Sequence, residues 1–190
     1  MQKLLAEIRN CKLCEPHLDL GARPIIAASE NSKILLISQA PGRIAHLKNK
    51  AWDDPSGKVL RKWLHVDESQ FYNTDHFAIL PAGFCFPGKG KSGDKLPRKE
   101  CAPLWHSKVM HQFKNVQLKI LIGNYAQTYY LKNKPRTLTE TVKNYQSFLP
   151  EYLVLPHPSP RNRFWIQKNP WFTNEVIPDL QKVVTKILST

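Results

Sequence analysis

The sequence predicts an α/β fold, a three-layer α/β/α sandwich around a central, mostly parallel four-stranded sheet. Four short apolar runs bounded by turn residues are typical of strands buried on both faces, and they span residues 33–38, 76–80, 118–123 and 151–156. Segments with helical spacing of apolar residues lie between these runs, which favours parallel strands joined by right-handed crossovers. The 190 residues contain no interdomain linker, repeat or low-complexity tract, so we expect a single domain, 1–190.

The helices are predicted from the spacing of apolar side chains along the chain. The sequence begins MQKLLAEIRN, in which Leu4, Leu5 and Ile8 share one helical face, so a first helix precedes the first strand. Further helices are expected between and after the strands, at residues 58–64, 103–113, 126–131, 138–148 and 174–188. The last segment has apolar residues at helical spacing over its whole length, at Val176, Ile177, Leu180, Val183, Val184 and Ile187.

The chain is strongly basic, with 28 Lys and Arg against 15 Asp and Glu and a net charge of +13. This surplus is typical of small domains that bind nucleic acid, although lysines scattered for solubility are the alternative interpretation. The N-terminus lacks the apolar run and cleavage site of a signal peptide, and no segment is long enough to span a membrane. We expect a cytoplasmic protein that acts as a monomer, and whose cysteines are reduced thiols.

Polar and turn-forming motifs follow the predicted strands directly. SQAPG (38–42), GNYA (123–126) and HPSPRN (157–162) each come after an apolar run, and the run at 76–80 leads into a loop that contains two cysteines. In an open parallel sheet, ligands bind outside the carboxyl ends of the strands. We therefore expect the functional site at this edge of the sheet.

The cysteine spacing indicates a metal site. Cys11 and Cys14 form a C-x2-C pair, and Cys85 and Cys101 follow as C-x15-C. A zinc ribbon would carry a second C-x2-C pair, so four cysteines without one leave room for an iron–sulfur cluster. The alternative is four buried cysteines without a ligand. A G-x-G-x-x-G pattern at 88–93 lies in the loop between the last two cysteines, but no helix opens on it, so nucleotide binding is disfavoured.

Taken together, these motifs resemble the iron–sulfur branch of the uracil-DNA glycosylase superfamily over nearly the whole chain. The cysteine spacing is similar to the cluster pattern of that branch. SQAPG resembles its first motif, written GEAPG in family 4 and GLAPA in family 5, and HPSPRN is similar to the second motif of the single-strand-selective monofunctional uracil glycosylase. The resemblance implies a monofunctional DNA glycosylase of base-excision repair with a [4Fe–4S] cluster on Cys11, Cys14, Cys85 and Cys101.

The resemblance also implies roles for the segment AWDDPSG (51–57) and for the second motif. Trp52 aligns with the aromatic residue that stacks on the base, and Asp54 with the catalytic carboxylate of family 5. His157 corresponds to the histidine that stabilises the departing base. The alternative is that these aspartates cap the following helix. Both roles could hold, one for each aspartate, and we then expect Asp54 to be the catalytic one.

The first motif departs from its relatives, since Gln39 stands where family 4 has glutamate, and an amide cannot act as a base. We expect Gln39 to place a water molecule or the deoxyribose. Pro81 stands where family 4 has the asparagine that recognises uracil, and Asn124 could substitute for it or cap a helix. The expected DNA-contacting residues lie in the HPSPRN segment and the basic loop, and they are Arg161, Asn162, Arg163, Lys89 and Lys91.

Two functions from different classes remain open at this point. The first is a glycosylase acting on a deaminated base in DNA, most often uracil, with hypoxanthine and xanthine as further candidates. The alternative is a nucleic-acid-binding module of the same fold whose catalysis is weak or lost, because the first motif lacks a carboxylate. A zinc-stabilised hydrolase of phosphate esters or nucleotides has the least support.

Overall fold

The computed structural model describes residues 1–190 and contains one four-stranded, wholly parallel sheet in the order β2-β1-β3-β4. The strands are β1 (Ile34–Ile37), β2 (Phe77–Ile79), β3 (Leu118–Ile122) and β4 (Tyr152–Leu155), and each lies within a predicted apolar run. Ile34 pairs with both Phe77 and Leu118, so β1 and its two neighbours start at the same level. The predicted fold class is confirmed.

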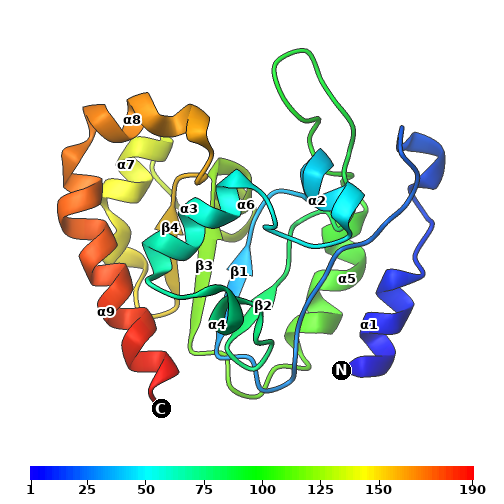
Figure 1. Ribbon diagram of the computed structural model, residues 1–190, viewed down its shortest axis with the longest axis horizontal. Coiled ribbons are helices and arrows are strands. Elements are labelled where there is room, and N and C mark those ends of the chain that lie inside the picture. The colour runs from blue at the N-terminus through cyan, green and yellow to red at the C-terminus, as the bar shows by residue number, and fades with distance from the viewer.

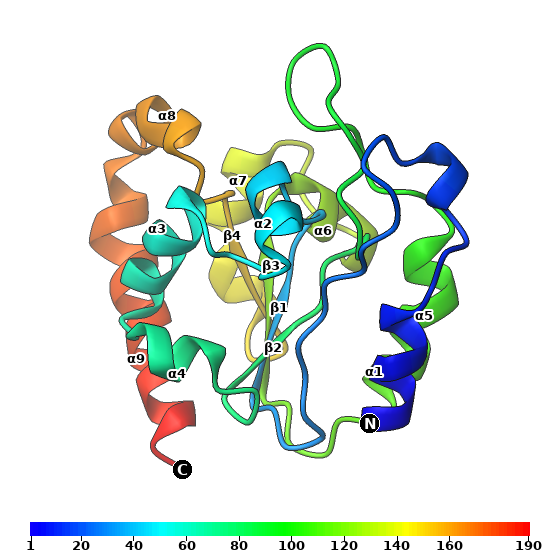
Figure 2. The same ribbon diagram turned by 45° about the vertical axis from the view of Figure 1, so that its right-hand side comes forward.

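Helices cover both faces of the sheet, which explains why the strands are almost entirely apolar. Figure 2 shows α3, α4 and α9 on one side and α1 and α5 on the other. The α-helices are α1 (Gln2–Arg9), α2 (Arg43–Lys48), α3 (Pro55–Leu64), α4 (Glu68–Tyr72), α5 (Cys101–Met110), α6 (Asn124–Tyr130), α7 (Leu138–Lys143), α8 (Arg163–Lys168) and α9 (Ile177–Leu188). A core of 35 buried residues joins these layers.

Some helix boundaries differ from the prediction. The segment 138–148 divides into α7 and a 3-10 turn, Tyr145–Phe148, and a π-turn, Phe172–Val176, precedes α9. The short helices α2, α4 and α8 were not predicted, because five or six residues are too few to establish a periodic pattern. None of the helices combines the length and apolar character needed to cross a membrane.

The carboxyl ends of the strands face the end of the molecule that lies away from both termini. Figure 1 shows α2, α8 and the long loop between β2 and α5 gathered at this end. The tip of that loop is a small hairpin in which Lys89 and Asp94 form an antiparallel bridge. Gly88 turns the chain into the hairpin with φ of +95°, a conformation that glycine adopts without strain.

Candidate active site

A cavity of about 360 Å³ opens at the carboxyl edge of the sheet. The SQAPG turn, the segment 51–56, the hairpin residues Lys89 and Asp94, and the HPSPRN turn all contribute to its lining. Their meeting follows from topology, because parallel strands end at one edge and their following turns are neighbours there. The predicted location of the site therefore coincides with a cavity that these motifs share. The GNYA segment does not line it.

Trp52 and His157 form the inner wall of this cavity. Trp52 is 7% exposed, and the centroids of the two rings are 5.7 Å apart with the planes inclined by 33°. A tryptophan ring in this position offers an apolar platform, and the adjacent imidazole offers a polar atom at its edge. The structure thus brings together the two residues expected to stack on a base and to stabilise its departure.

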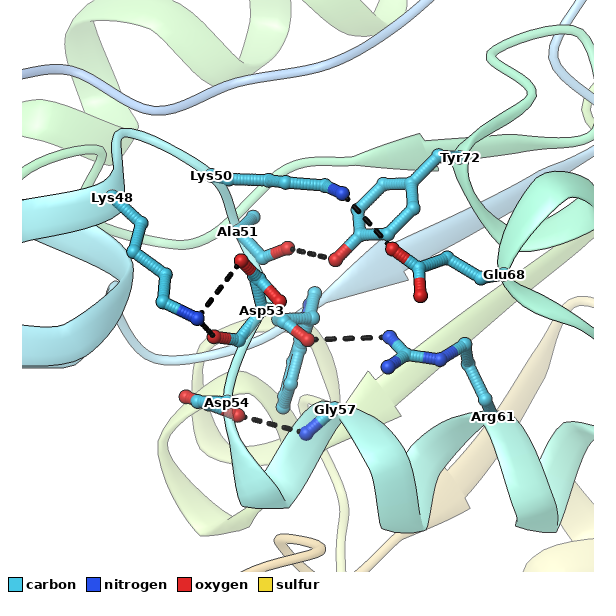
Figure 3. Close-up of polar contacts among 10 residues, drawn as sticks. Lys48, Lys50, Ala51, Asp53, Asp54, Gly57, Arg61, Glu68 and Tyr72 are labelled. Carbon is cyan, nitrogen blue, oxygen red and sulfur yellow. Dashed lines mark hydrogen bonds and ion pairs between the residues drawn. The ribbon is translucent and has the colours of Figure 1, made fainter.

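The Trp52 backbone adopts a left-handed conformation, with φ of +58°, which a bulky residue rarely adopts. Neighbouring groups hold it there (Figure 3). Arg61 donates a hydrogen bond to the Trp52 carbonyl at 3.3 Å, and the Tyr72 hydroxyl donates to the carbonyl of Ala51 at 2.9 Å. Gly57 permits the arrangement, since a Cβ at that position would lie 1.7 Å from the Trp52 carbonyl oxygen.

The two aspartates that follow Trp52 have different surroundings. Asp54 is the N-cap of α3, where its Oδ1 accepts a hydrogen bond from the Gly57 amide at 2.8 Å. Asp53 instead pairs with Lys48 at 3.1 Å and does not line the cavity. Of the two aspartates that could cap the helix, Asp54 is therefore the one that does so. Asp54 caps the helix through one carboxylate oxygen and also lines the cavity.

Burial lowers the pKa of His157, whereas the nearby carboxylates of Asp54 and Asp94 act in the opposite direction. Burial has the larger effect, so the imidazole is neutral at pH 7 and retains one N–H to donate. Asn162 fixes the turn that carries it by donating from Nδ2 to the His157 carbonyl at 2.7 Å. The site is therefore built to supply a neutral hydrogen-bond donor beside a carboxylate.

Of the residues predicted for catalysis and base binding, Gln39 and Asn124 do not line the cavity. The Gln39 side chain points to the basic loop, where its Nε2 donates to the Lys95 carbonyl at 3.4 Å. Asn124 is exposed as the first residue of α6, and the cap position belongs to Gly123. Neither residue lines the cavity, so the structure supports neither the water-placing role of Gln39 nor the base-binding and capping roles of Asn124.

Two of the five expected DNA-contacting residues line the cavity. These two are Arg161 and Lys89. Arg163 was expected in the loop before α8, but it is the first residue of that helix. Lys91 is exposed at the hairpin tip. The Asn162 side chain donates a hydrogen bond to the backbone of its own turn, whereas a contact with DNA was expected.

Much of the charge of the basic loop is neutralised within the protein. Lys89 pairs with Asp94 at 2.7 Å, and two further pairs, Lys95 with Asp19 at 3.3 Å and Arg98 with Glu100 at 2.7 Å, flank it. These ion pairs lie at the surface and each contributes little to stability. They do mean that the loop is less basic toward an approaching ligand than its sequence indicates.

Ser38, Arg43 and Asp94 are among the cavity residues that the sequence patterns did not single out. Asp94 lies in a loop whose fold over the cavity no local pattern predicts. Ser38 could have been found from the sequence. It stands where the first motifs of the resembled families have glycine, so this chain carries a hydroxyl at a position where those motifs have no side chain.

The four cysteines meet in a second cavity between the N-terminal segment and the basic loop. Cys11, Cys14, Cys85 and Cys101 all line it and form no disulfide. Burial raises the pKa of the Cys85 thiol to about 11 and that of Cys101 to about 12. The Phe84 amide donates to Cys101 Sγ at 3.4 Å. No three His, Cys, Asp or Glu side chains in the structure are arranged to hold a single metal ion.

Comparison with known proteins identifies related sequences and folds. The family model of the uracil DNA glycosylase superfamily matches residues 26–181, a span that includes every residue of the first cavity but begins after Cys11 and Cys14. A solution structure of a candidate uracil DNA glycosylase from Methanosarcina acetivorans superposes with a TM-score of 0.55. The match covers 86% of this chain and 98% of that chain at 14% identity, which shows a shared fold.

Proposed function

This chain belongs to the uracil DNA glycosylase superfamily, and we propose that it hydrolyses the N-glycosidic bond of a deaminated base in DNA, with uracil as the first candidate. The observation that carries the proposal is the convergence of Trp52, Asp54 and His157 on one cavity at the carboxyl edge of the sheet. The size of that cavity, about 360 Å³, suits a small ligand such as one extruded nucleobase.

The proposed reaction needs three contributions from these residues. Trp52 stacks on the base after it leaves the helix. The Asp54 oxygen that does not cap α3 accepts a proton from water as the water oxygen bonds to C1′ and the bond from C1′ to the base nitrogen breaks. The N–H of neutral His157 donates to a carbonyl oxygen of the base, where negative charge develops in the transition state.

We also propose that Cys11, Cys14, Cys85 and Cys101 hold a [4Fe–4S] cluster with a structural role. Support comes from their shared cavity and from the Phe84 amide directed at Cys101. Each thiolate of such a cluster binds a different iron, so the sulfurs need not surround one ion. Because burial opposes ionisation of Cys85 and Cys101, the positive charge of bound iron would be needed to keep them as thiolates.

The experiment is a glycosylase assay with oligonucleotides that carry uracil, hypoxanthine or xanthine, followed by alkaline cleavage of abasic sites. We expect the purified protein to release at least one of these bases, and His157→Ala to release it more slowly while binding the same DNA. The binding-module alternative draws on the position of Gln39, which leaves the first motif without a catalytic group in the cavity. DNA binding by the wild-type protein without release of any base would establish that alternative.

A further inference from the structure

Ser38 places a hydroxyl in the lining of the active-site cavity. It follows β1 directly, is 5% exposed, and lines the cavity together with the buried residues Ile79 and Pro81. These three residues come from the adjacent carboxyl ends of β1 and β2. A base that entered past Trp52 would meet them with its far edge.

The Ser38 hydroxyl makes no hydrogen bond within the protein, unlike the other buried hydroxyls. Ser32 Oγ donates to the Thr74 carbonyl at 2.6 Å, and Thr141 Oγ1 donates to the Thr137 carbonyl at 2.8 Å. Ser38 forms a hydrogen bond only through its backbone, where its carbonyl accepts from the Ala82 amide at 2.8 Å. Ser38 Oγ is not among the fully buried unpaired atoms, so it is accessible from the cavity and free to pair with a group that enters there.

The Pro81 carbonyl and the Trp52 indole are two other polar groups of the residues that line the cavity. The Pro81 carbonyl already accepts a hydrogen bond from His106 Nε2 at 3.0 Å. The indole N–H of Trp52 can only donate, whereas a serine hydroxyl both donates and accepts. Ser38 is therefore the one buried side chain of the lining that can match either kind of group on a base edge.

We propose that the Ser38 hydroxyl recognises the extruded base, donating to the carbonyl oxygen of a deaminated base or accepting from its ring N–H. This inference rests on the proposed function. Uracil, hypoxanthine and xanthine all present a carbonyl beside an N–H, so one rotatable hydroxyl serves all three. The same rotation lets it accept from the amino group of cytosine, so Ser38 discriminates weakly against undamaged bases compared with a fixed amide.

The test measures base recognition separately from catalysis. In an Asp54→Asn background, which slows release, affinities are measured for single-stranded oligonucleotides that carry uracil, hypoxanthine or a stable abasic analogue. Adding Ser38→Ala should reduce the preference for base-containing over abasic DNA about three- to tenfold, the value of one neutral hydrogen bond. Affinity for the abasic analogue should not change, because it has no base to contact. Ser147→Ala, an exposed serine on the 3-10 turn after α7, is the matched control.

Each outcome decides the inference. An unchanged preference in Ser38→Ala overturns it, and so does an equal loss of affinity for base-containing and abasic DNA, which would show a structural role. Ser38→Gly repeats the measurement if the alanine variant unfolds. Failure of the glycosylase assay with wild-type protein would refute the proposed reaction but leave this binding measurement valid, so the two failures are distinguishable.

Discussion

At the scale of single residues, Asp54 combines two roles that sequence patterns treat as alternatives. One carboxylate oxygen caps α3, which orients the side chain, and the residue lines the cavity beside His157. A cap is a sound support for a catalytic group because it fixes the carboxylate through a backbone hydrogen bond. The functional and structural interpretations of this position therefore do not compete.

Asp54→Asn should separate the two roles of this residue. Asparagine caps helices about as well as aspartate, so we expect a nearly unchanged melting temperature and DNA affinity. Excision should fall about 10²–10⁴-fold, because the amide cannot accept a proton from water. The matched control is Asp53→Asn, which removes only the pair with Lys48 and should excise at close to the wild-type rate. If Asp53→Asn is the inactive variant, the catalytic assignment belongs one residue earlier.

His106 links stability to pH. Its Nε2 donates to the Pro81 carbonyl, its Nδ1 accepts from the Tyr130 hydroxyl, and burial lowers its pKa to about 4. Between pH 6.5 and 4 the unfolded chain takes up a proton that the folded protein excludes, so stability is complete above pH 6.5 and declines as pH falls. The loss should reach roughly 3 kcal/mol by pH 4.

Urea unfolding at several pH values checks this prediction. His106→Gln should be less stable than wild type at pH 7, since it loses packing against Phe84, but its stability should decline less between pH 6.5 and 4. His65→Gln, which replaces an exposed histidine at the end of α3, is the matched control for the change of residue type. A decline in His106→Gln as steep as that of wild type would contradict the assignment.

At the scale of elements, the long regular segments were predictable and the short ones were not. The four strands lie inside the predicted runs because buried parallel strands are continuously apolar. The site residues that these strands carry directly, such as His157 after β4, followed from the same pattern. The direction of Gln39 and the fold of the 88–94 hairpin over the cavity depend on tertiary contacts, so no local pattern contains them.

If the proposed cluster is present, the loop between Cys85 and Cys101 should depend on it for order. Protein purified without oxygen should be brown and contain about four iron atoms per chain, as four cysteine ligands would bind. Cys85→Ala should lose the iron and become sensitive to proteolysis within this loop, because one anchor of the loop is gone. Limited digestion followed by mass spectrometry locates the cut, and metal analysis is the parallel measurement. Zinc in place of iron, or a colourless protein with no bound metal, would disprove the cluster.

At the scale of the whole molecule, the net charge of +13 is not spread evenly with respect to the proposed DNA site. Nine ion pairs engage basic side chains, and three of them neutralise Lys89, Lys95 and Arg98 of the basic loop. Lys91, Arg161 and Arg163 form none of these pairs, and Arg161 lines the cavity. Composition predicted that the net charge of the protein is positive. The ion pairs determine which basic side chains remain available to bind phosphate.

The salt dependence of DNA binding should therefore follow the unpaired cations. Replacing Lys91, Arg161 and Arg163 together with glutamine should reduce the slope of log affinity against log salt concentration by about two to three, since each lost phosphate contact removes about 0.7–0.9. The matched control replaces Lys3, Lys33 and Lys186, which lie near the amino ends of the strands or near the termini and remove the same charge. Fluorescence anisotropy with a labelled oligonucleotide at several salt concentrations measures both slopes. Equal slopes in the two triple variants would mean that the salt dependence reflects only the net charge of the protein. The surface around Lys91, Arg161 and Arg163 would then not be the phosphate-binding surface.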